Sequence, residues 1–386
     1  MVIKYGGSYA GFPEWWALIK SVTKSVWTGN WQTGPETKKF EEELAEDMGV
    51  KHAVMTSSGS CAGTLALASL ELPKGSEVII PAVTFPTIFN IIVQEGLVPV
   101  VVDCSPLTNN IDLDKLEKMK VSKKIKAIIA VHILGNPVDM PRLMKWAKKH
   151  GIKVIEDNCD GYGTTIRGKM AGSFGDISFT STHAAHIITT GVGGVVFTNN
   201  DKLMENVRMY RDWGRQTNTT KKNTHKELPT DYNPRFIYEK IGWNFQILEL
   251  QSAMGRVQLR KAKKIKAKRK NNYDYLLYNL PEPVGAVVGR EWSNPCWFAL
   301  PLATENRGGL VAHLEKNGIE TRSMMSGNIT KHPAYKNTKY RIGNKLDGAD
   351  LILKHSFWIS CHPSLTKKQL EYIVETFNDF FFAKKQ

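Results

Sequence analysis

The chain has 386 residues and a formal net charge of +15, with 42% hydrophobic and 23% charged residues. This length exceeds what one hydrophobic core usually holds, so we expect a large domain, residues 1–255, and a smaller one, residues 256–386. No apolar run reaches the roughly 18 residues that span a membrane, and the N-terminus lacks a basic-then-apolar signal. The five cysteines are scattered and never spaced as CxxC, which argues against disulfides and thiolate metal sites. We therefore expect a cytoplasmic protein that binds no membrane.

Positive charge is densest between Arg256 and Lys270, where basic residues are interleaved with apolar ones. This spacing is typical of one solvated face of a helix. No nucleic-acid-binding module accompanies it, so we do not expect nucleic acid as a partner. The excess charge fits anionic substrates instead.

Between about residues 50 and 200, short apolar strands alternate with loops and helices. The expected strands are residues 52–56, 77–83, 99–103, 125–133, 153–157, 177–182 and 194–198. Helical stretches such as 62–70, 87–94 and 141–150 lie between several of them. This alternation predicts an α/β fold with a mostly parallel, seven-stranded sheet covered by helices on both faces. Ligands of such sheets bind in the loops beyond the carboxyl ends of the strands.

The regularity lapses after Trp213. We expect a long polar loop at 216–234, a long helix at 247–280 and a turn-rich linker at 281–295. A second αβ unit follows, with a strand at 297–302, a helix at 310–317, a strand at 319–323 and a final helix from Lys367. This unit is the expected smaller C-terminal domain.

The first two strands end in loops with possible binding residues. Ser58, Gly59 and Ser60 lie where the first strand gives way to a helix. Such a turn offers N–H groups and hydroxyls to a phosphate, although many similar turns only cap a helix. Phe85, in the loop after the second strand, is either a core residue or a stacking platform for a flat ring.

Two carboxylates, Glu156 and Asp157, end the apolar strand 153–157. A buried carboxylate is costly without a cationic partner, and a protonated pyridine nitrogen is one such partner. A strand-end cap is the simpler alternative. Further on, His183 and His186 precede a glycine-rich stretch, but no third ligand lies near them, so we expect no metal site.

Together these segments resemble the DegT/DnrJ/EryC1/StrS family of sugar aminotransferases, which have the aspartate-aminotransferase-like fold type I and bind pyridoxal phosphate. The resemblance runs in order from Trp31-Gln32-Thr33-Gly34 through Ile155-Glu156-Asp157-Asn158 and Gly193-Gly194 to Gly242-Trp243-Asn244 and the last helix. Each motif alone is weak, but all of them in order are specific.

The resemblance assigns a role to each matching residue. It implies that Gly59, Ser60 and Ser181 hold the cofactor phosphate. By the same carry-over, Phe85 stacks on the cofactor ring, and Asp157 pairs with the pyridine nitrogen.

The resemblance also assigns roles to Asp160 and Asn244. Asp160 occupies the position that the family places near the 3-hydroxyl of the ring. Asn244 resembles the asparagine that reaches the cofactor phosphate of the neighbouring subunit, which implies a homodimer with shared active sites.

The main departure from the family is at position 186. Counting back from Gly193-Gly194, the lysine that binds the cofactor covalently falls there, and this chain has His186 instead. An imidazole cannot form the imine that a lysine forms, but it moves protons near neutral pH. Histidine at this position is typical of the pyridoxamine-phosphate-dependent nucleotide-sugar 3-dehydratases. The resemblance therefore implies removal of the C3 hydroxyl from a nucleotide-linked 4-keto-6-deoxyhexose, with His186 as the base.

The cofactor cycle and the substrate are less closely specified. CDP-linked members of this subgroup hold an iron–sulfur cluster on four cysteines, but segment 216–234 has no cysteine, so we expect no cluster. In this respect the chain is similar to the GDP-linked members, which renew the cofactor amine from glutamate; a separate reductase is the alternative. Candidates for binding the substrate diphosphate are Arg215, Arg322 and Lys331, since cationic side chains recognise phosphates. Asn328 is a further substrate-binding candidate, because Arg322 with Ser326-Gly327-Asn328 resembles the 3-dehydratase subgroup, as does Phe357-Trp358-Ile359.

Two other functions remain open. The chain could be a sugar aminotransferase whose lysine lies elsewhere, although no lysine occurs between Lys169 and Lys202. It could also be a non-catalytic paralogue that only binds the cofactor.

Overall fold

The computed structural model describes residues 1–386 except 217–224, 283 and 383–386. Its centre is an eight-stranded sheet with the order β1-β9-β8-β5-β4-β2-β3-β14. The strands are β1 (His52–Thr56), β2 (Glu77–Pro81), β3 (Val98–Val102), β4 (Ile125–Val131), β5 (Lys153–Asp157), β8 (Ile177–Ser181), β9 (Gly194–Thr198) and β14 (Arg341–Ile342). β9 runs antiparallel to both its neighbours, and the other neighbouring pairs are parallel.

All seven expected strands are present, so the mostly parallel α/β sheet is confirmed. The expected count of seven is wrong by one. The eighth strand, β14, is only two residues long and comes from the C-terminal part of the chain to pair with the edge strand β3. Two residues give no periodic pattern that a sequence could reveal.

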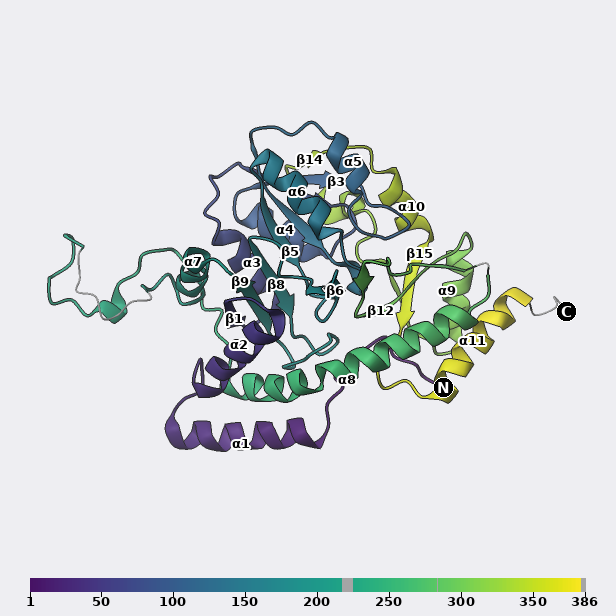
Figure 1. Cartoon of the computed structure of the whole chain (residues 1–386), viewed down its shortest axis with the longest axis horizontal. Coiled ribbons are helices and arrows are strands. Elements are labelled where there is room, and N and C mark those ends of the chain that lie inside the picture. Colours follow the sequence, from purple (N-terminus) through teal and green to yellow (C-terminus); the bar gives the residue numbers. More distant parts are fainter. Residues whose placement is uncertain (217–224, 283, 383–386) are drawn as a thin grey trace.

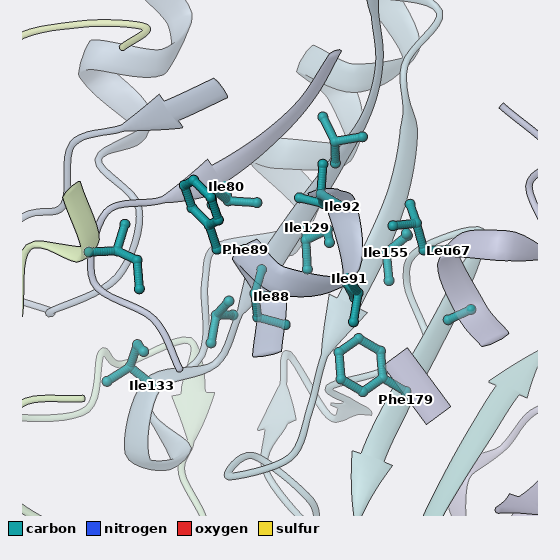
Figure 2. Packing of buried hydrophobic residues seen from close by; sticks show 14 of the residues in the cluster. Leu67, Ile80, Ile88, Phe89, Ile91, Ile92, Ile129, Ile133, Ile155 and Phe179 are labelled. Atoms are coloured by element: carbon teal, nitrogen blue, oxygen red, sulfur yellow. The ribbon is translucent and has the colours of Figure 1, made fainter. Parts of the chain in front are cut away.

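Helices cover the sheet on both faces (Figure 1). They are α3 (Gly59–Ala68), α4 (Pro86–Gln94), α5 (Leu113–Lys118), α6 (Met140–His150) and α7 (Asp201–Arg211). Within β2, Val78 and Ile80 pack with α3 and α4, whereas Ile79 packs with α5 and α6. Figure 2 shows the first of these clusters, in which Ile88 and Ile91 of α4 face the sheet. Strand side chains alternate between two buried faces, which explains the continuous apolar runs.

The remaining elements flank this core. On one side, α1 (Phe12–Thr28) and α2 (Pro35–Met48) pack against the long helix α8 (Glu249–Asn279), which runs on to the C-terminal elements (Figure 1). The C-terminal elements are an antiparallel sheet of β10 (Gly285–Ala286), β12 (Ala299–Ala303), β15 (Ser356–Ser360) and β13 (Thr321–Ser323), with α9 (Arg307–Lys316), α10 (Asp347–His355) and α11 (Lys367–Phe382). A small third sheet joins β6 (Thr165–Ile166), β7 (Lys169–Met170) and β11 (Ser293–Asn294).

The predicted long helix, the αβ unit and the last helix all exist, whereas α1, α2, α10 and β15 were not predicted. The expected loop 216–234 lies partly outside the described residues. The expected boundary at residue 255 falls inside α8, and we propose it as the point where the chain leaves the large domain. Within the described part of the chain, no helix has both the length and the apolar character needed to cross a membrane.

Candidate active site

A cavity of about 480 Å³ opens at the carboxyl ends of the parallel strands. The loops after β1, β2, β4, β5 and β8 line it. Arg322 of β13, Trp358 of β15 and Phe298, which directly precedes β12, line it from the C-terminal part of the chain. This is the location expected for ligands of such a sheet. Eight predicted residues come together here: Gly59, Ser60, Phe85, Asp157, Asp160, Ser181, His186 and Arg322.

The N-terminus of α3 forms one wall of the cavity. The Ser58 hydroxyl accepts the backbone N–H of Cys61 at 3.1 Å and so caps the helix, while Gly59 and Ser60 occupy its first turn. A Cβ on Gly59 would lie 2.7 Å from the Cβ of Ser181, so only glycine allows this approach. First-turn N–H groups have no acceptor within their own helix, which suits an anion such as a phosphate.

Asp157 and its neighbour Glu156 have opposite environments. Glu156 accepts the N–H groups of Gly172, Phe174 and Gly175 at 2.7–2.8 Å and the His132 ring at 3.1 Å. Burial acts to raise the pKa of Glu156, but these bonds hold it below its usual value. Glu156 therefore fixes the loop 172–175 and caps no helix, so the strand-end cap weighed for this pair does not describe it.

Asp157 faces the cavity and accepts one N–H, from Cys159 at 3.0 Å. Burial raises its pKa, and within the described chain it forms no ion pair with Lys, Arg or His. A buried carboxylate with so little compensation is suited to a cationic ligand. A protonated ring nitrogen would supply that charge.

Phe85 is 59% exposed and lines the cavity mouth, so its alternative assignment to the core is wrong. Phenylalanine is among the residue types most often buried, so an exposed ring beside a cavity stands out. Such a ring is suited to stacking on a flat ligand.

His186 lies in the loop between β8 and β9, within the same cavity. Its Nδ1 is buried without a hydrogen-bond partner, 3.7 Å from Oδ1 of Asp160, and its ring lies 5.3 Å from that of Phe298. Burial lowers the pKa of His186 to about 3, assisted by the charges of His183 and Arg269. The imidazole is therefore neutral near pH 7 and able to accept a proton. No lysine belongs to the described residues that line the cavity.

Two of the remaining candidates lie together away from the cavity. The Asn328 amide donates to Asp350 at 2.7 Å, and the Lys331 ammonium lies 3.9 Å from the same carboxylate. Neither lines the cavity. Asn328 is buried and serves a local turn, because its side-chain oxygen also accepts from Thr330.

Arg215 and Asn244 also lie outside the cavity of this chain. Arg215 pairs with Asp212 at 3.5 Å and lies over the rings of Trp213 and Tyr238. Asn244 is exposed and bridges Asp212 through its backbone.

The cavity also contains residues to which sequence reasoning gave no ligand role. These residues are Tyr5, His132, Phe298 and Trp358. Tyr5 lies in the N-terminal segment, which a backbone bridge from Ile3 to Ile319 holds against the C-terminal sheet. Only Trp358 had a signal, since it belongs to a segment similar to the dehydratase subgroup; the others are set by contacts between distant parts of the chain.

Comparison with known proteins agrees with this geometry. A model of the DegT/DnrJ/EryC1/StrS aminotransferase family matches residues 17–378. The lipopolysaccharide biosynthesis protein RfbH of Salmonella typhimurium is 38% identical over 375 residues, which cover 90% of this chain and 86% of that protein. The dTDP-4-dehydro-2,6-dideoxy-D-glucose 3-dehydratase of Saccharopolyspora spinosa is 36% identical over 372 residues, or 90% of this chain and 80% of that protein.

Among solved structures, a GDP-4-keto-6-deoxymannose 3-dehydratase with a trapped PLP–glutamate geminal diamine superimposes with a TM-score of 0.89. It is 30% identical and covers 97% of this chain and 100% of its own. The fold is thus that of the pyridoxal-phosphate-dependent aminotransferases. The chain itself belongs to the DegT/DnrJ/EryC1/StrS aminotransferase family and is an enzyme of that family.

The residues present fit the cofactor of that fold. The first turn of α3, with Gly59 and Ser60, lines the cavity beside Ser181 and offers N–H groups and hydroxyls for its phosphate. Phe85 is an uncovered aromatic for its ring, and Asp157 is a buried carboxylate without a cationic partner among the described residues. The three features lie in one cavity.

Proposed function

We propose that this enzyme is a 3-dehydratase that uses pyridoxamine or pyridoxal phosphate to remove the C3 hydroxyl of a nucleotide-linked 4-keto-6-deoxyhexose. One observation carries the proposal: a neutral, buried imidazole, His186, stands in a cofactor cavity that no described lysine lines. Without that lysine the cofactor stays noncovalent, and the imidazole is free to act as a base.

The cofactor, when bound, would supply an amine that condenses with the sugar ketone and a ring that accepts electrons. Gly59, Ser60 and Ser181 would hold its phosphate. Phe85 would cover one face of the ring, and the carboxylate of Asp157 would keep the ring nitrogen protonated.

His186 would move one proton through the reaction. With cofactor and substrate bound, its neutral ring would take up one proton as the base. The imidazolium so formed would return that proton to the departing C3 hydroxyl, which would leave as water. Burial supports this cycle because it keeps the imidazole uncharged before the reaction begins.

The surroundings also suggest the partners of the reaction. A nucleotide diphosphate is anionic, and Arg322 is the one of the four proposed substrate residues that lines the cavity. The solved relative holds glutamate on its cofactor, which supports glutamate as the donor that renews the amine; a separate reductase is the alternative. Exposed Asn244 supports a homodimer in which each chain completes the phosphate site of the other.

The test is incubation of the enzyme with pyridoxamine phosphate and CDP- or GDP-4-keto-6-deoxyhexoses, with and without glutamate. Mass spectrometry should detect a sugar that has lost one oxygen atom. His186→Ala should reduce the rate by roughly 10²- to 10⁴-fold, the usual contribution of a general base, while cofactor affinity stays near that of the unmodified enzyme. Near-full turnover by His186→Ala would exclude the role assigned to this residue.

Transamination is the second candidate, because the family as a whole is one of aminotransferases. Glutamate and the keto-sugar would then yield an amino-sugar, in which an amine replaces the ketone oxygen. The same spectrum separates the two products. A non-catalytic paralogue would yield neither.

A further inference from the structure

Asp160 uses its two carboxylate oxygens in different ways. Oδ2 accepts the backbone N–H of Leu134 at 3.2 Å, while Oδ1 faces Nδ1 of His186 at 3.7 Å. Leu134 is held in the left-handed region, with φ 50° and ψ 25°, and its carbonyl accepts the N–H of Phe298 at 2.9 Å. Strained residues of this kind persist only where their surroundings fix them. Oδ2 is therefore held in place, and Oδ1 is left for the histidine.

The imidazole of His186 is confined from the opposite side. The ring of Phe298 lies 5.3 Å away, and buried Arg269 of α8 donates to the carbonyls of Phe298 at 2.6 Å and Ala185 at 3.4 Å. His186 therefore sits between the Asp160 carboxylate and the Phe298 ring. A hydrogen bond with the backbone of Cys159 acts to raise the pKa of His186 against the effect of burial. A buried Nδ1 without a partner is costly, and a shift of less than about 1 Å would bring Oδ1 into hydrogen-bond range.

We propose that Asp160 is a positioning residue that accepts the Nδ1–H of His186 and thereby leaves the electron pair on Nε2. This inference rests on the proposed function and deepens it. The resemblance relates Asp160 to the 3-hydroxyl of the cofactor ring, whereas the geometry directs one of its oxygens at the base.

The proton balance is simple. His186 starts neutral, with its proton on Nδ1, and accepts a second proton at Nε2 to become an imidazolium beside the Asp160 carboxylate. The proton on Nε2 then leaves with the C3 hydroxyl as water. The Nδ1 proton stays in place throughout, so the pair is unchanged after each turnover.

Several titratable groups surround the pair. His183 belongs to the same loop as His186, Asp157 and Cys159 follow β5, and Arg269 reaches in from α8. The other titratable side chains that line the cavity are Tyr5, His132 and Arg322. Burial, together with Asp157, raises the pKa of Asp160 to about 7, although the Leu134 N–H and Arg269 act in the opposite direction. Above about pH 7 the carboxylate is ionised and can accept Nδ1–H, so the rate should rise with pH through this value.

The inference is tested with Asp160→Asn, which replaces the acceptor by an amide that can donate, and with Asp160→Glu, which keeps the acid. In the cofactor-free protein, ¹⁵N NMR should find the His186 proton on Nδ1 in the unmodified enzyme and on Nε2 in Asp160→Asn. The His186 signals are identified by their loss in His186→Gln. This readout does not depend on turnover, so it decides the inference even if no sugar is deoxygenated.

In the loaded enzyme, Asp160→Asn should lower kcat by on the order of 10²- to 10⁴-fold and remove the rise near pH 7, while Asp160→Glu should recover part of the rate. Pyridoxamine phosphate should bind both variants as tightly as the unmodified enzyme. Exposed Asp114 provides the matched control, and Asp114→Asn should change nothing. A proton on Nε2 of unmodified His186, or a loss confined to cofactor affinity, would overturn the inference.

Discussion

Burial acts in opposite directions on the two central residues of the cavity. It lowers the pKa of the His186 imidazole to about 3 and raises that of the Asp157 carboxyl. Both residues are thereby biased toward their uncharged forms. A cationic ring beside Asp157 would restore the charge of the carboxylate but leave the base neutral, which is the combination that proton abstraction requires.

Restoring an amine at position 186 gives a direct test of this placement. The variant His186→Lys should bind pyridoxal phosphate covalently, because burial favours the neutral, nucleophilic amine. Solutions should turn yellow, and borohydride followed by peptide mass spectrometry should locate the adduct at position 186. His183→Lys, three residues earlier and also at the cavity, is the control and should show no such adduct. Failure to find an adduct in His186→Lys would show that this loop does not face the cofactor.

For single residues, the sequence predicted those cavity side chains that lie at the end of a strand or in the loop directly after it. Asp157 and Ser181 end β5 and β8, and His186 lies in the loop that follows β8, so topology alone brings them to the same edge of the sheet. Arg215 and Lys331 fall outside the cavity because their positions depend on loops after Trp213, where no periodic pattern fixes the chain.

Among the elements, α1 shows why an apolar pattern can mislead. Its buried side chains are Glu14, Ser21 and Ser25, whereas Trp15 and Trp27 are exposed. Glu14 pairs with Lys261 and Gln258 of α8, so a polar seam joins the two helices. Hydrophobic periodicity would have assigned the opposite face of α1 to the core. In the strands of the central sheet, the apolar pattern and the observed burial agree, because both faces of these strands are buried.

The start of α2 depends on a side chain from α8. The carboxylate of Glu249 accepts the N–H groups of Gly34, Glu36 and Thr37 at 2.7–3.0 Å, and the hydroxyl of Thr37 at 2.6 Å. The N-cap residue itself, Gly34, has no side chain to do this. Glu249→Ala should therefore lower the free energy of unfolding by about 2–4 kcal/mol, because it leaves buried donors unpaired.

Urea unfolding checks this value, with Glu249→Gln expected to lose less and Glu371→Ala, on the exposed side of α11, expected to lose almost nothing. A loss below about 0.5 kcal/mol for Glu249→Ala would mean that water replaces the carboxylate at the helix terminus.

Several large apolar side chains are exposed on the surface of the single chain. Trp27 is 84% exposed, and Ile241, close to Asn244 in the chain, is 96% exposed. Both observations support the proposed homodimer, in which Asn244 would complete the neighbouring phosphate site. The sequence alone could not assign these residues to a subunit interface, because a solvent-exposed apolar residue and an interface residue look the same in a single sequence.

A mixing experiment tests the shared site. His186→Ala removes the base, and Asn244→Asp places a negative charge where the partner's cofactor phosphate would lie, so each homodimer should be nearly inactive. In each heterodimer of the two variants, one of the two sites carries neither change, so a pure heterodimer should have about half of the unmodified activity. After random exchange of an equal mixture, about half of the dimers are heterodimers, so the mixture should recover about a quarter of that activity. Recovery should require subunit exchange, which brief mild denaturation allows. No recovery in verified heterodimers would place both residues in the same chain's site.

The short strand β14 limits where the chain can be cut into fragments that fold. Arg341 pairs through its backbone with Val100 of β3, and its guanidinium lies 2.8 Å from the Glu77 carboxylate. A fragment that stops near residue 255 would therefore expose the free edge of β3 and leave Glu77 without its counter-ion. Chimaeras that exchange C-terminal halves between relatives must bring a compatible replacement for this strand, because each half supplies part of the other's architecture.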